Sequence, residues 1–381
     1  MSGIAASTPV WLNQLDERER AALRPGVPAA LDRRPDVLVV GGGVQGLAAA
    51  TACRELGLGR VLLIERDHLA AGPSGSAAGA LCPDSHLDVE GPAFVEFARA
   101  SLARCEALAA EAGPELRLRW LDWLLVGPAG PRLAELPGIQ RLGADDVRRL
   151  VPALAIETPG LLLPRGQAHL NPQRLAVALA ARGGTVATGV EYLGLRAAGG
   201  RAEVVRTSHG DLHPGAVVLA TGLAPAGLLP VEQLRVKGHL AATAPCAIAP
   251  PCVLTAALTE AGGTVTPLED GRLLVGGDRV PDDGAPDVDT ATIGAFHAEL
   301  ARLLPDAAGQ EFSHAWSCVR PATADRLPVV DRAPGLDNVW VTAGHYTTGV
   351  LLAPATGHAL ASWIATGVAP AAAAQFRLRP A

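Results

Sequence analysis

Residues 36–68 have a pattern of apolar and polar positions that predicts a compact unit of structure. An apolar run, DVLVV, leads into a glycine turn and an alanine-rich stretch, and a second apolar run then ends on an acid. Short apolar runs bounded by glycine are typical of buried strands, and the alanine-rich stretch between them is typical of a helix. The pattern therefore predicts a βαβ unit.

Two further helices are predicted from the residues at their ends. In LNPQRLAVALAARGG, Asn171 caps a helix that Pro172 opens and Gly183 closes. Closer to the start of the chain, Thr8 and the proline that follows it predict a helix over 9–23. We interpret this second helix as a surface element that covers the fold.

The later part of the chain contains more strand-like runs and one unusual box. Runs at 185–195 and 202–207 predict strands, and AVVLATG at 216–222 predicts a buried strand that ends on glycine. The stretch GHYTTGVLLAPATG holds a small polar box between Gly344 and Gly349. An apolar, alanine-rich run follows the box at once and predicts a helix.

Composition narrows the class of protein. The chain has 381 residues, of which 49% are hydrophobic and 18% charged, and its length suits about two folded domains. The net charge is −6, and no lysine- or arginine-rich run occurs. The sequence therefore has no electrostatic footprint for nucleic acid or for an anionic membrane surface. We expect the ligands to be small molecules.

The first residues, the last apolar run and the cysteines bear on the compartment. The N-terminal stretch turns acidic and polar before any apolar core of signal-peptide length, which disfavours secretion. The stretch 351–374 carries Pro354, His358 and Pro370 and is mostly alanine, so we expect no membrane span. Six cysteines without a CxxC pair argue against a zinc site. We expect a cytoplasmic protein without a metal.

The glycine turn of the βαβ unit has the spacing of a dinucleotide-binding fingerprint. Gly41, Gly43 and Gly46 stand at G-x-G-x-x-G spacing, and Glu65 ends the second strand. The first glycine permits the turn, the second lets the backbone approach a pyrophosphate, and the third lets helix pack on strand. Free N–H groups at the helix start attract the phosphates, and the acid would accept hydrogen bonds from the ribose. The strand, helix and acid in this order favour a dinucleotide cofactor.

Later segments resemble FAD enzymes of the D-amino-acid oxidase superfamily. AVVLATG resembles a strand that many FAD enzymes place beside the glycine turn, and GPSGSAAGAL at 72–81 resembles their loop along the pyrophosphate. The block CVRPATADRLPVVDRAPGLDNVWVTAGHYTTGVLLAPATG resembles the glycine oxidases of thiamine biosynthesis, with R-P-x-T-x-D-x-x-P followed by G-H-[FY]-x-x-G-I-L-L-A-P-A-T. The segment LRVKGHL at 234–240 also resembles the glycine oxidases. Sarcosine oxidases are enzymes related to the glycine oxidases.

The resemblance implies an α/β fold, with a Rossmann-type FAD-binding domain and an inserted α+β substrate domain built on an antiparallel sheet. HLAATAP, GGTVTPLE and RLLVGGD are candidate strands of that sheet. The segments that we expect are an N-terminal extension (1–35), a discontinuous FAD-binding domain (36–95, 151–235 and 313–381) and a substrate domain (96–150 and 236–312).

The resemblance also implies a set of FAD-binding residues. By analogy, His345 to Leu351 lie along the pyrimidine side of the flavin ring. We expect the following helix to begin near Leu351, with Pro354 in its first turn, and to aim N–H groups at the ring. The complete set of expected cofactor residues is Gly41, Gly43, Val44, Gln45, Gly46, Glu65, Arg66, Ser74, Gly75, Gly79, Ala80, Leu81, Val190, Ala220, Thr221, Gly222, Gly344, His345, Tyr346, Thr347, Thr348, Gly349, Val350 and Leu351.

On the substrate side, Arg320 stands where the glycine oxidases have the arginine that binds the substrate carboxylate. A guanidinium matches a carboxylate with two parallel hydrogen bonds, although a buried structural ion pair is the alternative. Thr347 replaces a second arginine of the family's G-H-F-R-N-G box, and Thr264 aligns with a substrate-contacting tyrosine. Both changes remove bulk. We therefore expect an N-substituted glycine or a secondary amino acid to fit better than glycine.

The resemblance implies hydride transfer from the carbon next to nitrogen to flavin N5, which gives an imine that water hydrolyses. No catalytic acid or base is required once the amine is neutral, so we assign His345 to the flavin loop in preference to a role as a base. The electron acceptor is O2 or another molecule. The alternative function is a flavin dehydrogenase subunit that passes electrons to a partner or a quinone. The sequence does not decide whether the chain forms a homo-oligomer.

Cys318 raises a separate question about the cofactor. It aligns with the cysteine that monomeric sarcosine oxidases bond covalently to the flavin 8-methyl carbon. Glycine oxidases, by contrast, hold FAD without a covalent bond, and an unpaired cysteine usually behaves as a small buried hydrophobe. We expect non-covalent FAD, with a bond to Cys318 as the alternative.

Overall fold

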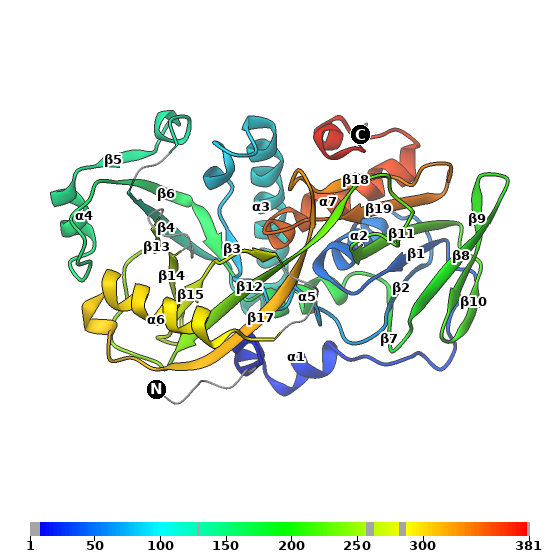
Figure 1. Cartoon of the computed structure of the whole chain (residues 1–381). Helices are drawn as coiled ribbons and strands as arrows, with labels where there is room; N and C mark the ends of the chain where they lie inside the picture. Colours follow the sequence, from blue (N-terminus) through cyan, green and yellow to red (C-terminus); the bar gives the residue numbers. More distant parts are fainter. Residues whose placement is uncertain (1–7, 128–129, 257–262, 282–286, 379–381) are drawn as a thin grey trace.

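The computed structural model describes residues 8–127, 130–256, 263–281 and 287–378. Two large sheets lie side by side in it, each with helices against one face (Figure 1). The helices are α1 (Glu17–Ala22), α2 (Val44–Glu55), α3 (Pro92–Ala112), α4 (Ala144–Leu150), α5 (Pro172–Ala180), α6 (Thr290–Leu303) and α7 (Gly349–Thr366). Short 3₁₀ turns are η1 (Val10–Gln14), η2 (Asp84–His86), η3 (Gly113–Glu115), η4 (Leu133–Glu135), η5 (Pro305–Ala307) and η6 (Ala371–Phe376).

The first sheet has six strands in the order β18-β19-β11-β1-β2-β7. Neighbouring strands are parallel, except that β18 runs antiparallel to β19. Their bounds are β1 (Val37–Val40), β2 (Val61–Glu65), β7 (Thr185–Thr188), β11 (Ala216–Gly222), β18 (Val329–Arg332) and β19 (Val339–Ala343). The predicted βαβ unit is confirmed, since β1 and β2 are parallel and α2 connects them.

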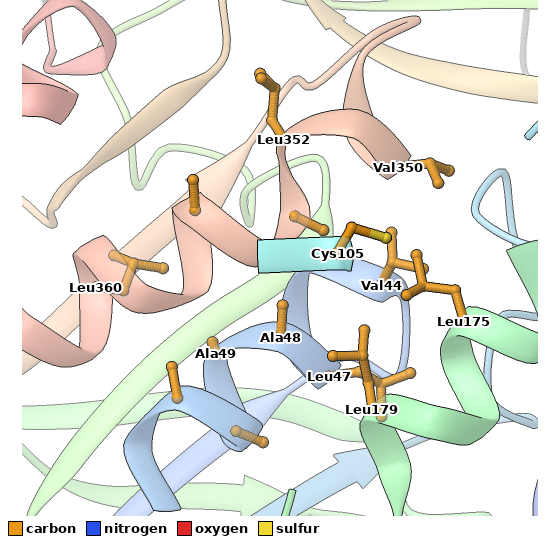
Figure 2. Close-up of a cluster of buried hydrophobic side chains, with 14 of the residues drawn as sticks. Val44, Leu47, Ala48, Ala49, Cys105, Leu175, Leu179, Val350, Leu352 and Leu360 are labelled. Carbon is orange, nitrogen blue, oxygen red and sulfur yellow. The ribbon is translucent and has the colours of Figure 1, made fainter. Parts of the chain in front are cut away.

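Helices cover one face of this sheet and a small sheet covers the other. On the helical side, α2, α3, α5 and α7 share one buried cluster, in which Leu47 of α2 lies beside Leu179 of α5 (Figure 2). A side chain at Gly357 would overlap the backbone of Ala48, so this glycine lets α7 approach α2 closely. The opposite face packs against a three-stranded antiparallel sheet of β8 (Tyr192–Ala198), β9 (Arg201–Thr207) and β10 (Gly210–Leu212).

The second large sheet has ten strands. Eight follow the order β16-β12-β15-β14-β13-β4-β6-β3, while β17 pairs with β12 and β5 with β6. Most pairs are antiparallel, and β4 with β13 is parallel. The bounds are β3 (Ala80–Leu81), β4 (Arg119–Val126), β5 (Gln140–Leu142), β6 (Gly160–His169), β12 (Gln233–Thr243), β13 (Val253–Ala256), β14 (Gly263–Pro267), β15 (Leu273–Gly276), β16 (Val280–Pro281) and β17 (Phe312–Thr323). Side chains of α4 and α6 bury one of its faces.

Several predicted elements need correction at their ends. The expected helix over 9–23 is wrong: η1 is followed by an extended Leu15, and α1 begins only after Asp16. The Asp16 carboxylate accepts a hydrogen bond from the Glu19 N–H, and Glu19 accepts one in return, so this capping box restarts the helix. The stretch is also not purely a surface element, because Trp11 is buried and donates to the carbonyl of Ala77.

Other boundaries also move. The predicted strand 185–195 is two strands in different sheets, because Gly189 between them has a φ of +82°. Asn171 caps α5 as predicted, although the helix ends at Ala180. The last helix begins at Gly349, two residues earlier than expected, so Pro354 lies beyond its first turn.

The strand pairing bears on the expected domain segments. The candidate strands within 236–312 belong to the large sheet, but so do β6 from the segment 151–235 and β17 from the C-terminal segment. The division into two domains with those limits stays a prediction. Among the described helices, none is both long enough and apolar enough to cross a membrane.

Candidate active site

A cavity of about 1060 Å³ extends from the glycine turn after β1 into the second sheet. Gly41 and Glu65, at the carboxyl ends of β1 and β2, line one part of it. Thr264 and Leu274, from β14 and β15, line another part. Ligands of α/β proteins bind at the carboxyl ends of parallel strands, so the topology itself marks this cavity as the candidate site.

The glycine turn is shaped by contacts with β11. Gly41 has a φ of +111°, and a side chain there would overlap the carbonyl of Ala220. A side chain at Gly46 would overlap the carbonyl of Gly41 itself. At Gly43, by contrast, the nearest atom to an added Cβ is Ser74 Oγ at 3.1 Å. Two glycines therefore serve packing, whereas Gly43 keeps open the space in front of the N-terminus of α2.

Glu65 closes this end of the cavity. Its Oε2 accepts a hydrogen bond of 2.6 Å from the Gly42 N–H, and its Oε1 accepts one of 2.9 Å from the Asp67 N–H. Each carboxylate oxygen can accept a further hydrogen bond. Glu65 therefore helps to fix the glycine turn and can still accept hydrogen bonds from ribose hydroxyls.

The polar box at 344–349, here called the C-terminal box, contacts the start of α2 at the cavity wall. Gln45 Nε2 donates a hydrogen bond of 2.7 Å to the carbonyl of Gly349 and lies 3.3 Å from His345 Nδ1. The other ring nitrogen of His345 lies 2.6 Å from Thr342 Oγ1. Burial lowers the pKa of His345 to about 3. The ring is therefore neutral near pH 7 with both nitrogens engaged, which favours the flavin-loop role over that of a base.

These features form a site that fits FAD. Gln45 is buried on the cavity wall, and its Oε1 has no hydrogen-bond partner among the described residues. A bound cofactor with hydroxyl or N–H donors would satisfy this acceptor, which is otherwise costly to bury. The N-termini of α2 and α7 both border the cavity, through Val44 and Val350, and attract the negative charge of a pyrophosphate and of a reduced flavin.

Arg320 lies on the wall of the same cavity. Its Nη1 donates a hydrogen bond of 2.8 Å to the carbonyl of Asp278, and a side chain at Gly238 would overlap the guanidinium. The carboxylate of Asp278 is occupied elsewhere, at 2.6 Å from the His239 N–H and 2.7 Å from its Nδ1. In the described parts of the chain Arg320 makes no ion pair, so the alternative of a buried structural pair has no support here.

Three side chains form a polar and aromatic wall of the cavity. Trp123 Nε1 donates a hydrogen bond of 2.9 Å to Thr255 Oγ1, which lies 3.5 Å from Thr264 Oγ1. Sequence analysis predicted only Thr264. Trp123 and Thr255 were missed because the parallel pairing of β4 with β13 brings them together, and no local pattern announces that pairing.

Most predicted cofactor residues line the cavity, and six do not. Gly46, Gly75, Gly79, Leu81, Gly344 and Thr348 are absent from its wall. The first supports helix packing, and a side chain at Gly75 or Gly79 would overlap Gln173 or the carbonyl of Leu170. Leu81 is in the core, Gly344 is packed against Thr323, and Thr348 is buried at the start of α7. These residues shape the site from behind.

Cys318 also lines the cavity, opposite Gly238 in the pairing of β12 with β17. Burial raises the pKa of its thiol, and the Arg320 guanidinium offsets only part of that rise. A thiol is a poor nucleophile compared with a thiolate, so these surroundings favour non-covalent FAD. Within the described residues no group of three or more His, Cys, Asp or Glu side chains could hold a metal ion.

Comparison with known proteins identifies the family. The family model described as FAD dependent oxidoreductase matches residues 36–363. The chain belongs to this family. Its FAD-dependent chemistry agrees with the fingerprint turn and with the unpartnered acceptor on Gln45.

Individual relatives of this FAD-dependent oxidoreductase are glycine oxidases. The chain is 29% identical to that of Geobacillus kaustophilus over 357 residues, which covers 86% of this chain and 92% of the relative. It is 30% identical to that of Pseudomonas aeruginosa, covering 85% and 93%. The crystal structure of the Geobacillus kaustophilus enzyme superimposes with a TM-score of 0.81 at 26% identity, over 92% of this chain and 99% of that one.

Proposed function

We propose that this FAD-dependent oxidoreductase oxidises the C–N bond of an amine or amino acid that carries a carboxylate. The observation that carries the proposal is Arg320, a guanidinium fixed to the carbonyl of Asp278 on the wall of the FAD cavity. A cation in this position without a carboxylate partner in the described residues is suited to an anionic ligand. The glycine oxidases among its relatives support an amino acid as that ligand.

Each part of the cavity then has a role. Arg320 binds the substrate carboxylate, and Trp123 and Leu125 exclude water from the amine. Gln45 and His345 hold the C-terminal box against α2, so that the cofactor and the substrate keep one relative orientation. Bound FAD would supply the acceptor for a hydride from the carbon next to nitrogen, and water would hydrolyse the resulting imine.

Two side chains of the cavity support a substrate larger than glycine. Thr347 lies exposed at the edge of the cavity, and Thr264 lies on its wall. By the resemblance to glycine oxidases, Thr347 replaces an arginine and Thr264 replaces a tyrosine. Two smaller side chains leave room for a substituent on the amine. We infer that the substrate is an N-substituted glycine or a secondary amino acid.

The six cysteines are free, which supports a reducing cytoplasm as the compartment of the protein.

The proposal is tested by adding amines to the holoenzyme without oxygen and following the loss of flavin colour. We expect bleaching by at least one carboxylated secondary amine, and slower or no bleaching by the same amine without its carboxylate. Admission of air to the bleached sample then reports whether O2 accepts the electrons. If no carboxylated amine reduces the flavin, the proposed function is wrong and a subunit that relays electrons becomes the better account.

A further inference from the structure

Two residues at the edge of the cavity have a left-handed backbone, with a positive φ, which residues other than glycine rarely adopt. Arg326 has a φ of +64° and Tyr346 a φ of +47°; the only other such residue apart from glycine, in the described ranges, is Ala70. Both line the cavity, and the Arg326 guanidinium carbon lies 6.0 Å from the centre of the Tyr346 ring. Strained residues of this kind persist where the surrounding structure imposes them, and they gather at functional sites.

Hydrogen bonds impose the conformation of Arg326. Its N–H donates to the carbonyl of Thr323 at 3.0 Å, and the Thr323 hydroxyl lies 2.6 Å from the carbonyl of Leu327. The Asp325 carboxylate accepts from the Leu327 N–H at 3.1 Å. The turn is therefore locked on both sides of Arg326. The lock leaves the arginine side chain exposed on the cavity wall.

Arg320 lies within β17, whereas Arg326 lies beyond the end of that strand. The Arg320 guanidinium lies over Gly238, which pairs with Cys318, two residues back along the strand. Arg326 stacks on the ring of Tyr346. The backbone N–H of Tyr346 donates a hydrogen bond of 2.7 Å to the carbonyl of Pro321. The two guanidinium groups therefore have different contacts: that of Arg320 lies against Gly238 and the carbonyl of Asp278, and that of Arg326 lies over the Tyr346 ring.

Arg326 also makes no ion pair with a carboxylate of the described residues. Among the residues that the structure describes, its only recorded side-chain contact is the one with the Tyr346 ring. An aromatic ring orients a guanidinium by cation–π attraction and leaves its N–H groups free for an anion. When Arg320 binds one carboxylate of the substrate, Arg326 is therefore a second oriented cation on the wall of the same cavity.

We propose that Arg326, stacked on Tyr346, binds a second carboxylate of the substrate. The preferred substrates are then secondary amines or amino acids with two carboxylates, of which Arg320 holds one and Arg326 the other. The inference rests on the proposed function and specifies its substrate class. Arg326 acts in specificity and takes no part in the transfer of electrons.

The test uses two ligands in which an ether oxygen replaces the amine nitrogen, so that neither is oxidised as an amine. Diglycolate has two carboxylates and methoxyacetate has one. Calorimetric titration of the holoenzyme should show that Arg326→Gln weakens diglycolate binding about tenfold, the loss of one charge-assisted contact, and changes methoxyacetate binding less than about twofold. The matched control is Arg279→Gln, which removes another exposed arginine from the cavity wall and should leave both affinities within about twofold.

A second variant separates specificity from folding. Glycine adopts a left-handed φ without strain, so Arg326→Gly should weaken diglycolate binding as the glutamine variant does without lowering the thermal midpoint. An unchanged affinity for diglycolate in both variants overturns the proposal. So does an equal loss with Arg279→Gln or with methoxyacetate, because that result would reflect the general charge of the cavity.

The outcomes also separate this inference from the proposed function. If carboxylated amines bleach the flavin but diglycolate binds wild type and Arg326→Gln alike, the inference fails and the function stands. If diglycolate binding depends on Arg326 while no amine reduces the flavin, the oxidation of amines fails and Arg326 remains an anion site. A changed flavin reduction potential in Arg326→Gln, without a change in diglycolate binding, would overturn the inference and assign Arg326 to the cofactor.

Discussion

The side chain of Gln45 donates a hydrogen bond of 2.7 Å to the backbone carbonyl of Gly349, 304 positions later in the chain. Gln45 is in the first turn of α2, and Gly349 is the first residue of α7. The bond therefore holds together the two helix starts that face the FAD cavity. Because Gln45 Oε1 points to no described partner, the same side chain can both tie the helices and accept a bond from the cofactor.

Replacing Gly43 by valine should remove FAD without unfolding the chain. The φ of −72° at Gly43 suits any residue, and the nearest atom to an added Cβ is the Ser74 hydroxyl at 3.1 Å, so the side chain would fill the space expected for the pyrophosphate. The ratio of flavin to protein absorbance measures cofactor content, and circular dichroism measures folding. The matched change Gly46→Val should disrupt folding, because it overlaps the Gly41 carbonyl. Full flavin content in folded Gly43→Val would contradict the fingerprint.

Local patterns predicted three of the six strands of the first sheet, and they did not predict β18 and β19. The apolar runs of β1, β2 and β11, the glycine turn and the Asn171 cap depend on residues close together in the sequence. Local patterns do not give the pairing of distant segments, such as that of β4 with β13, which lie more than 120 positions apart in the sequence. The same reason explains the missed Trp123. Arg326 was missed because its left-handed backbone is imposed by the surrounding turn, while arginine itself gives no signal for it.

Thr347→Arg should improve the use of glycine. Thr347 is exposed at the cavity edge, where a longer cationic side chain has room and can reach the carboxylate of a small substrate. Steady-state kinetics should give a KM for glycine several-fold lower than that of the wild type. Thr347→Gln, which has length without charge, is the control and should not give this gain. If the arginine variant fails to improve glycine use, the assignment of Thr347 to the substrate side is wrong.

The flavin should come free of the protein on acid precipitation. Burial raises the pKa of Cys318, so the thiolate needed to attack the flavin is scarce. We expect the yellow colour in the supernatant. A yellow pellet that becomes colourless in Cys318→Ala, but stays yellow in Cys82→Ala, would instead establish a covalent bond at Cys318; Cys82 lines the same cavity.

Stability should fall between pH 7 and pH 5, in part because of His345. Its pKa is about 3 in the folded protein and 6.5 in a free side chain, so in this range the unfolded chain binds a proton that the folded chain does not. The cost at pH 5 is about 2 kcal/mol. His345→Gln should therefore lose less stability over this range in urea unfolding. An equal loss in both proteins would show that His345 is not buried in its neutral form.

The Arg320→Lys variant tests the central claim, that Arg320 binds the carboxylate of the substrate. The measurement is anaerobic flavin reduction by the carboxylated amine that bleaches the wild type fastest, compared with the same amine without its carboxylate. Lysine keeps the charge but loses the fork, so binding of the carboxylated amine should weaken by about 1–3 kcal/mol, while the other amine reacts as in the wild type. Arg332→Lys, an exposed site that pairs with Asp337, is the control. Unchanged reduction of Arg320→Lys by the carboxylated amine would contradict the account.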